Sequence, residues 1–316
     1  MNDREGQPTT ADLQEVVEDT YAEGFRSIYG EILVTARDSR WLQHAVNAVT
    51  GHASSTIMCD CEAGVAQWLS GQPHSSQETP DGRPGAIVQF HVPRFVKHRE
   101  KQLEKVMLAR ISQNLLTCPT ARCFNRLPTD DYFKLGRKVA LFGDRHQFRE
   151  TRFGEPGWVI PILGGEFFLS RRFGFRDGVM GGNLWFFGPS EDIALEAAER
   201  AAAAVEASPD VITTFPGGIA ASGSKAGSSY DFLIAATYAE YCPTLKSKLG
   251  ERSRVPANVQ SIMEIILNGR DLEALKQATG KAIRAAAEVD GLVKIGAGNY
   301  GGRLGKTFIH LHEVMS

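Results

Sequence analysis

Glu264 is the residue whose surroundings most clearly indicate chemistry. It lies in residues 261–267, a segment that predicts a strand with apolar residues on both faces. Burying a carboxylate there costs several kcal/mol, or raises its pKa until the acid stays neutral. A neutral carboxylic acid can donate a hydrogen bond to a developing oxyanion. From these residues alone, a structural glutamate satisfied by a lysine or by backbone N–H groups is an equal alternative.

Three short motifs resemble known sites but lack the context that those sites need. Residues 296–301 spell G-x-G-x-x-G, yet a strand at 306–312 is predicted after them instead of the helix that holds a pyrophosphate. Ser222 and Lys225 spell S-x-x-K without the S-D-N and K-T-G elements of penicillin-binding enzymes. His310 and His312 would share one face of a strand, but no third metal ligand accompanies them. We therefore predict no metal site.

The composition narrows the class of protein. The chain has 316 residues, 42 % of them hydrophobic and 23 % charged, which is typical of a globular protein. A formal net charge of −2 argues against nucleic acid as the main ligand. No segment has the length of a membrane span. Five cysteines at irregular spacing do not indicate a disulfide framework, so we expect a cytoplasmic protein.

The elements that must position Glu264 recur in both halves of the sequence. The first half predicts strands at 31–36, 54–58, 86–92 and 114–118, with helices after Asp38 and over 97–113. The second half predicts strands at 183–188, 211–215, 259–267 and 292–295, with helices that begin at Pro189-Ser190 and at Asp271. Long loops at 60–85 and 216–258 interrupt the two halves at the same point.

This repeat predicts the fold class α+β. We expect two duplicated ferredoxin-like lobes, each built from two β-α-β units as an antiparallel sheet with helices on one face. The predicted boundaries are a flexible, polar N-terminal extension at 1–18, an N-terminal lobe at 19–157 and a C-terminal lobe at 158–316. The break lies near 149–158, where Gly154-Glu155-Pro156-Gly157 interrupts regular structure.

Ordered segments from about residue 19 to the C-terminus carry a resemblance to a known family. They are STIMC (55–59), EAG (62–64), ETPDGRPG (78–85), GGN (181–183), FPGGI (215–219), SKAGS (224–228), YDFL (230–233), YCPT (241–244), KIGAGN (294–299) and IHLH (309–312). With these motifs the chain resembles the formylmethanofuran:tetrahydromethanopterin formyltransferases.

The resemblance implies two ferredoxin-like lobes, a homo-oligomer that is typically a tetramer, and metal-free transfer of a formyl group. The two coenzymes, tetrahydromethanopterin and a methanofuran-type coenzyme with a primary amine, would be substrates, and no tightly bound cofactor is expected. Glu264 matches the catalytic glutamate of the family, which favours the catalytic interpretation over the structural one. The substrate-binding residues expected from the shared motifs are Asp81, Arg83, Ser224, Lys225 and Asn299.

Two departures from the archaeal members point to a bacterial version of the enzyme. The chain has a polar N-terminal extension, and its 35 Lys and Arg nearly balance its 37 Asp and Glu. It is similar to the formyltransferase subunit of a formyltransferase/hydrolase complex in C1-oxidising methylotrophs, which implies hydrolase subunits as partners that release formate. The direction of net flux and the exact furan coenzyme stay open. The alternative is a non-catalytic coenzyme-binding or scaffold subunit of such a complex.

Overall fold

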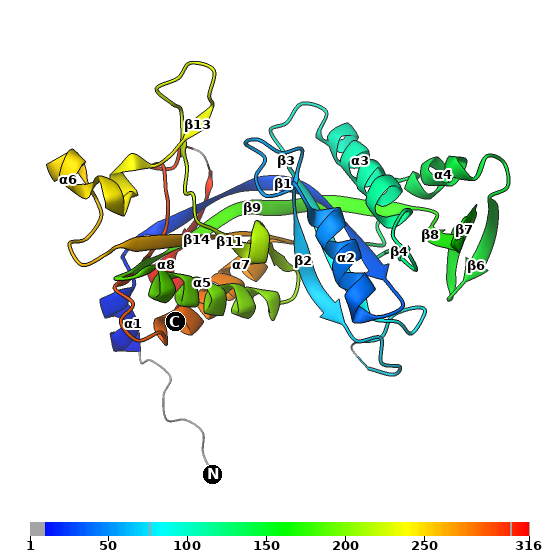
Figure 1. Cartoon of the computed structure of the whole chain (residues 1–316), viewed down its shortest axis with the longest axis horizontal. Helices are drawn as coiled ribbons and strands as arrows, with labels where there is room; N and C mark the ends of the chain where they lie inside the picture. Colours follow the sequence, from blue (N-terminus) through cyan, green and yellow to red (C-terminus); the bar gives the residue numbers. More distant parts are fainter. Residues whose placement is uncertain (1–9, 76, 304, 316) are drawn as a thin grey trace, which may run out of the picture. The chain divides into compact units, whose positions relative to one another are not determined.

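The computed structural model describes residues 10–75, 77–303 and 305–315 (Figure 1). The chain divides into two compact units. The inserted unit is Arg26–Gly178, and the terminal unit combines Met1–Phe25 with Val179–Ser316. Strands β1 (Tyr21–Thr35) and β9 (Phe173–Gly188) each begin in one unit and end in the other. The fold is mixed α+β with a mostly antiparallel sheet, as predicted.

The inserted unit has strands in the order β2-β3-β1-β4-β8-β7-β6. Its elements after β1 are α2 (Ser39–Thr50), β2 (Glu62–Leu69), β3 (Gly85–Pro93), α3 (Arg99–Arg110) continued by η1 (Ile111–Leu115), β4 (Arg122–Asn125), β5 (Tyr132–Phe133), α4 (Leu135–Ala140), η2 (Leu141–Gly143), β6 (Phe148–Arg152), β7 (Glu155–Ile162) and β8 (Gly165–Ser170). The pairs β2–β3, β3–β1 and β1–β4 are antiparallel, and β4–β8 is parallel. Alternate residues of β1 and β3, such as Ile32 and Val88, form a core with α2 and α3.

The terminal unit has the strand order β10-β14-β9, and β15 pairs with the other edge of β9. Its elements are α1 (Thr10–Val16), α5 (Glu191–Glu206), β10 (Val211–Thr213), η3 (Pro216–Gly218), β11 (Ile219–Ala220), β12 (Lys225–Ala226), β13 (Ala235–Ala236), η4 (Ala239–Tyr241), η5 (Pro243–Leu245), α6 (Lys246–Leu249), η6 (Gly250–Arg252), β14 (Ser261–Gly269), α7 (Leu272–Ala287), β15 (Lys294–Gly296), β16 (Thr307–His310) and α8 (Leu311–Val314). The side chains of Ser190 and Asp271 cap α5 and α7 by accepting backbone N–H groups, which confirms both predicted helix starts.

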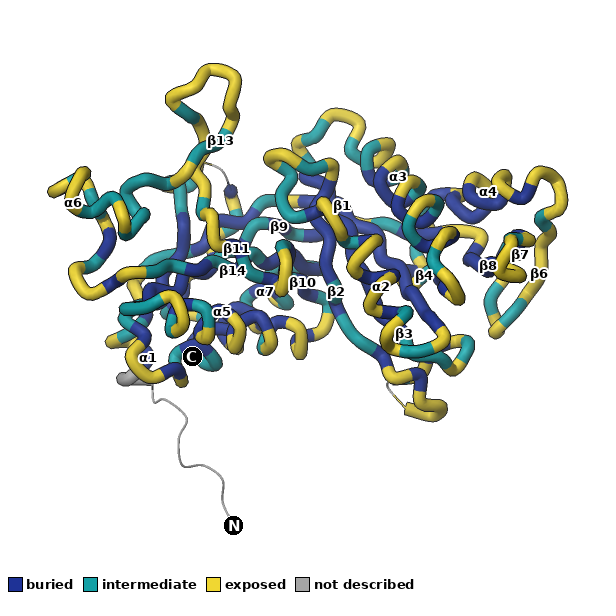
Figure 2. The backbone as a smooth tube through the Cα atoms, in the orientation of Figure 1, coloured by how far each residue is buried: buried dark blue, intermediate teal, exposed yellow. Residues whose placement is uncertain are grey.

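Helices α5 and α7 cover one face of the terminal unit's sheet (Figure 1). Met263, Ile265 and Leu267 of β14 point into this core, together with Leu184 and Phe186 of β9. The β12–β13 hairpin and α6 lie on the other side of the sheet, and Figure 2 shows the hairpin largely exposed. Because side chains alternate along a strand, Glu264 belongs to this second face.

The structure differs from several predicted elements. Residues 54–58 form turns, and the strand of this region is β2, which lies within the predicted loop at 60–85. Residues 114–118 continue the helical turns after α3, and the strand follows at β4. Both errors have one cause, because short apolar runs fit a buried helix or turn as well as a strand.

The predicted division at 157/158 also differs from the compact units. Residues 149–158 lie in the antiparallel hairpin of β6 and β7, inside the inserted unit. The structure also differs from the flexible extension predicted at 1–18. Among the described residues of this segment, α1 is helical, and Leu13 and Val17 are buried in the terminal unit. Residues 1–9 of that prediction lie outside the described residues.

Candidate active site

Glu264 lies at the centre of β14, between two neighbouring strands. Its backbone is opposite Trp185 of β9 and opposite Ala220 of β11. The side chain is half-buried on the face away from α5 and α7. A carboxyl group on a rigid central strand is held in place by the ladders on both sides, which is the precision that a catalytic group requires.

Two side chains of β9 donate hydrogen bonds to one oxygen of Glu264. Asn183 Nδ2 donates to Oε1 at 2.8 Å, and the indole Nε1 of Trp185 donates to the same oxygen at 2.9 Å. Asn183 and Trp185 are two residues apart on the strand, so both point to the face that carries Glu264. The carboxyl is therefore oriented by two uncharged donors.

Burial raises the pKa of Glu264 above its usual range, and the hydrogen bonds from Asn183 and Trp185 offset part of that increase. Among the described residues, no lysine or arginine forms an ion pair with Glu264. The structural alternative of a glutamate satisfied by a lysine is thus not observed. Burial therefore acts in favour of the neutral carboxylic acid, in which the free oxygen can donate a hydrogen bond.

Aromatic rings pack around the Trp185 indole that donates to this carboxyl group. Trp185 packs edge-on against Tyr241 and Tyr238, with ring centroids 4.6 and 5.8 Å apart. Tyr238 in turn stacks with Tyr300 at 6.4 Å. Burial raises the pKa of Tyr300 to about 12, with the nearby Glu264 carboxylate as a further cause. These rings lower the local polarity and limit water around Glu264.

The glycine-rich loop after β15 completes the site. A side chain at Gly298 would place its Cβ 2.6 Å from Trp185 Cζ2 and 2.7 Å from Asn183 Nδ2. Glu23 of β1, which is buried, accepts N–H groups from Tyr300 at 2.6 Å and Gly302 at 2.7 Å. Glycine is therefore required where the loop touches the two donors of Glu264, and Glu23 holds the loop in place.

Three predicted binding residues lie on segments that meet at this loop. Asn299 donates to Thr20 Oγ1 at 2.9 Å, so its amide group is engaged within the terminal unit. Ser224 is exposed, and its backbone carbonyl accepts the hydroxyl of Tyr300 at 2.8 Å. Lys225 is exposed on β12. The structure therefore brings Ser224 next to Tyr300, and Tyr300 next to Glu264.

Asp81 and Arg83 belong to the inserted unit, in the loop between β2 and β3. The buried carboxylate of Asp81 accepts from Arg83 Nε at 2.7 Å, Arg122 Nη1 at 2.9 Å and Thr35 Oγ1 at 2.8 Å. Arg83 also donates to the carbonyl of Thr120 at 2.7 Å. These contacts fix the loop, and the predicted role of both residues in substrate binding stays a prediction.

Sequence reasoning missed Asn183, Trp185 and Tyr300 as functional residues. Asn183 was noticed only as part of a shared motif. One signal that could have found the first two is their i, i+2 spacing, since an amide and an indole on one face of a strand need a polar partner there. That partner is about 80 residues away in sequence, and no local pattern reveals the pairing.

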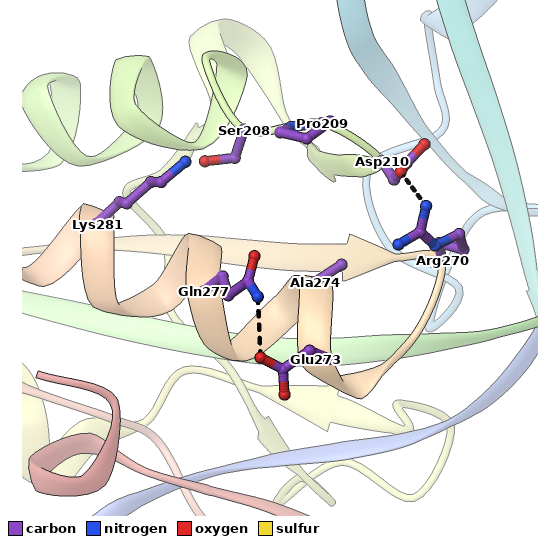
Figure 3. Close-up of a pocket in the computed structure, with 8 residues that line it drawn as sticks. All are labelled: Ser208, Pro209, Asp210, Arg270, Glu273, Ala274, Gln277 and Lys281. Atoms are coloured by element: carbon purple, nitrogen blue, oxygen red, sulfur yellow. Dashed lines mark hydrogen bonds and ion pairs between the residues drawn. The ribbon is translucent and has the colours of Figure 1, made fainter. Parts of the chain in front are cut away.

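A separate pocket lies at the ends of α5 and α7, on the helix side of the sheet (Figure 3). It is lined by Ser208, Pro209, Asp210, Arg270, Glu273, Ala274, Gln277 and Lys281. Arg270 pairs with Asp210, and Gln277 donates to Glu273 at 2.9 Å. Most of its polar side chains pair with one another, and it lies on the side of β14 opposite Glu264. It is therefore not a candidate active site.

Three further features of the described residues bear on the predictions. No group of three or more His, Cys, Asp or Glu in this part of the chain could hold a metal ion. His312 lies on α8, where its Nε2 contacts the carbonyl of Val17 at 2.9 Å, so the predicted strand face shared with His310 is wrong. No described helix has both the length and the apolar character that a membrane crossing requires.

Comparison with known proteins gives the family of this fold and site. The family model for formylmethanofuran-tetrahydromethanopterin formyltransferase matches residues 13–162 of this chain. The family model for the proximal lobe of that enzyme matches residues 165–314. The chain belongs to this family. The predicted family and the predicted enzyme class, an acyltransferase of the formyltransferase type, are thereby confirmed.

Individual relatives cover nearly the whole chain. The formylmethanofuran–tetrahydromethanopterin formyltransferase of Methanocaldococcus jannaschii is 41 % identical over 303 residues, which span 94 % of this chain and 97 % of the relative. The solved formyltransferase of Methanosarcina barkeri is 40 % identical, with a TM-score of 0.88, and the match covers 96 % of this chain and 99 % of that one.

A second solved structure is the formyltransferase/hydrolase complex of Methylorubrum extorquens with methylofuran. The matching chain is 36 % identical, with a TM-score of 0.85, over 95 % of this chain and 96 % of that chain. At this identity and coverage, the family's formyltransferase fold extends over both compact units.

Proposed function

We propose that this formyltransferase moves a formyl group between a ring nitrogen of tetrahydromethanopterin and the amine of a methanofuran-type coenzyme, with Glu264 as its acid. The observation that carries this proposal is the carboxyl of Glu264, held by Asn183 and Trp185 in an aromatic setting that raises its pKa. The names of the relatives supply the two coenzymes.

The proposed reaction begins when the acceptor nitrogen attacks the carbonyl carbon of the formamide. A C–N bond forms, and the carbonyl electron pair moves onto oxygen to give a tetrahedral oxyanion. Neutral Glu264 donates a hydrogen bond to that oxygen. The intermediate then collapses: the C–N bond to the donor nitrogen breaks, the C=O bond re-forms, and the departing nitrogen takes up a proton in exchange for the one that the attacking nitrogen gives up.

Water exclusion is the second requirement of this chemistry, because hydrolysis of the formamide competes with transfer. The rings of Trp185, Tyr238, Tyr241 and Tyr300 support the proposal that the site is kept dry. The backbone N–H groups of Gly217, Gly298 and Gly301 are further candidate donors to the oxyanion, whereas those of Gly218, Tyr300 and Gly302 already donate within the chain.

We propose the coenzyme contacts at Asp81, Arg83, Ser224, Lys225 and Asn299. Exposure of Ser224 and Lys225 beside the Tyr300 loop supports their part of this proposal. Both coenzymes act as substrates in it, without a tightly bound cofactor.

We propose hydrolase subunits as partners, supported by the similarity to the complex of Methylorubrum extorquens. A homotetramer and a cytoplasmic location complete this proposal, the latter supported by five free cysteines.

We also propose that each lobe derives from a duplicated ferredoxin-like unit. Both units contain the element order β-α-β-β-α-β, as β1-α2-β2-β3-α3-β4 and as β9-α5-β10-β14-α7-β15. Numbering the four strands in chain order, both sheets have the order 2-3-1-4. An identical order of strands in two lobes of one chain supports duplication.

The test of the function is formyl exchange by the purified chain with both coenzymes, followed by absorbance. We expect exchange by the wild-type chain and its loss in Glu264→Ala. A folded wild-type sample without exchange, both alone and with its hydrolase partners, would support the scaffold alternative instead.

A further inference from the structure

Two donors converge on one oxygen of Glu264 and leave the other free of them. The Asn183 amide and the Trp185 indole both reach Oε1, at 2.8 and 2.9 Å. An indole N–H can only donate, so Oε1 must accept. A proton on Oε1 would point at N–H groups that cannot receive it.

We propose that Trp185 and Asn183 are positioning residues that place the acid proton of Glu264 on Oε2 and direct it toward the reacting formyl oxygen. This inference rests on the proposed function. It goes further by naming the oxygen that carries the proton and the two side chains that decide it.

The orientation of the Asn183 amide agrees with this assignment. Its Oδ1 is enclosed and makes no hydrogen bond among the described residues. A buried acceptor without a partner is unfavourable. Rotating the amide by half a turn would place Oδ1 instead of Nδ2 against Glu264 Oε1. In the structure Nδ2 faces Oε1. The orientation therefore agrees with Oε1 as an acceptor, which it is in the carboxylate and also in the acid that carries its proton on Oε2.

The surrounding groups keep these two donors in place. Trp185 is buried, with Tyr241 packed edge-on at 4.6 Å. Gly298 leaves room for both Trp185 and Asn183. The backbone of Trp185 lies directly opposite Glu264 in the β9–β14 ladder, so the indole and the carboxyl share one register position.

The two donors also make the free O–H a better donor. Hydrogen bonds to Oε1 stabilise the carboxylate form and so act against the effect of burial on the pKa of Glu264. Removing one donor should have two effects, one on the rate and one on the pKa of Glu264. The rate should fall, because the acid is less well oriented and a weaker donor, while the neutral form should persist to higher pH.

Several other titratable groups lie near the site. Tyr238 follows β13 and Tyr300 lies in the glycine-rich loop, and burial raises the pKa of both phenols. Glu23 faces the backbone of the Tyr300 loop from β1. Tyr241 contacts Arg254, and Arg254 pairs with Glu240. Lys294 lies over Phe187 and pairs with Glu18, and Lys225 is exposed on β12 next to Ser224.

The decisive variant is Trp185→Phe in the full chain, which keeps an aromatic ring against Tyr241 but removes the N–H. We expect kcat to fall about tenfold or more, from the loss of one hydrogen bond to an ionisable group. KM for both coenzymes should change little, and the alkaline limb of the kcat–pH profile should move to higher pH. Trp158→Phe, the same substitution on β7 in the inserted unit, is the matched control and should leave the limb unchanged.

A second readout does not depend on activity. Infrared titration of the carboxylic C=O stretch, with Glu264→Gln as the blank, should show the acid form persisting to higher pH in Trp185→Phe. Asn183→Leu should show the same change and serves if Trp185→Phe does not fold. If the midpoint pH of this infrared titration is unchanged or lower in the folded variants, the inference is wrong. If the midpoint pH is higher but the wild-type chain shows no formyl exchange, the positioning role of Trp185 and Asn183 is supported and the proposed function is refuted.

Discussion

Gly298→Ala is the smallest change that tests how the site is assembled. The new Cβ would lie 2.6 Å from Trp185 Cζ2 and 2.7 Å from Asn183 Nδ2. Carbon atoms in contact are normally about 3.5–4.0 Å apart. The indole must therefore retreat by about 1 Å, and the amide must shift with it. The backbone of Gly298 has no positive φ, so the effect is purely steric.

A displacement of about 1 Å of a positioning group is enough to cost on the order of 10²-fold in rate. We therefore expect Gly298→Ala to keep its fold but to lose about two orders of magnitude in kcat. The assay is formyl exchange at saturating coenzymes, with circular dichroism and thermal unfolding as checks on the fold.

The matched control is Gly182→Ala on β9, next to Asn183. A Cβ there would meet its nearest neighbour, Ile309 Cδ1, at 3.5 Å, which is an ordinary contact. We expect this variant to keep nearly the wild-type rate. Wild-type turnover in Gly298→Ala, with the control also active, would refute the reasoning that this glycine sets the position of the two donors.

Three further outcomes are expected. Glu264→Ala should lose on the order of 10²–10³ in kcat or more, as for an oxyanion donor, and Glu264→Gln, which keeps an N–H donor, should lose less; wild-type rates would exclude Glu264. Because burial raises the pKa of Glu264 and the neutral acid is the active form, kcat should decrease as pH rises through that pKa, and an activity that instead rises there would contradict the assignment. Deleting residues 1–9 should leave activity intact. Deleting residues 1–17 removes the buried Leu13 and Val17 and should lower the free energy of unfolding, measured by chemical denaturation, by about 2–5 kcal/mol or more. Equal stability of the two deletion variants would contradict this expectation.

The sequence was a good guide where the signal is local. A charged residue in an apolar strand made Glu264 a candidate, and its catalytic role stays a prediction. Ser190 and Asp271 identified the starts of two helices because a capping side chain acts within three residues. The strand β2 was missed because Glu62 and Gly64 interrupt its apolar alternation.

The partners of Glu264 could not be predicted for a different reason. Asn183 and Trp185 reach it only because β9 and β14 pair in one particular register, over a separation of about 80 residues. A shift of that register by one residue would turn both side chains to the opposite face. Local periodicity gives the elements of a sheet but not their pairing, so the first contacts of the acid emerged only from the structure.

The contact between Glu23 and the Tyr300 loop has a consequence for the order of synthesis. Glu23 leaves the ribosome long before its partners at Tyr300, Gly302 and Gly305, which lie more than 270 residues later in the chain. The same is true of β1 and β16, where Tyr21 pairs with His310. Contacts this distant along the chain form late. A nascent chain can therefore contain the whole inserted unit before the loop that Glu23 holds has been synthesised.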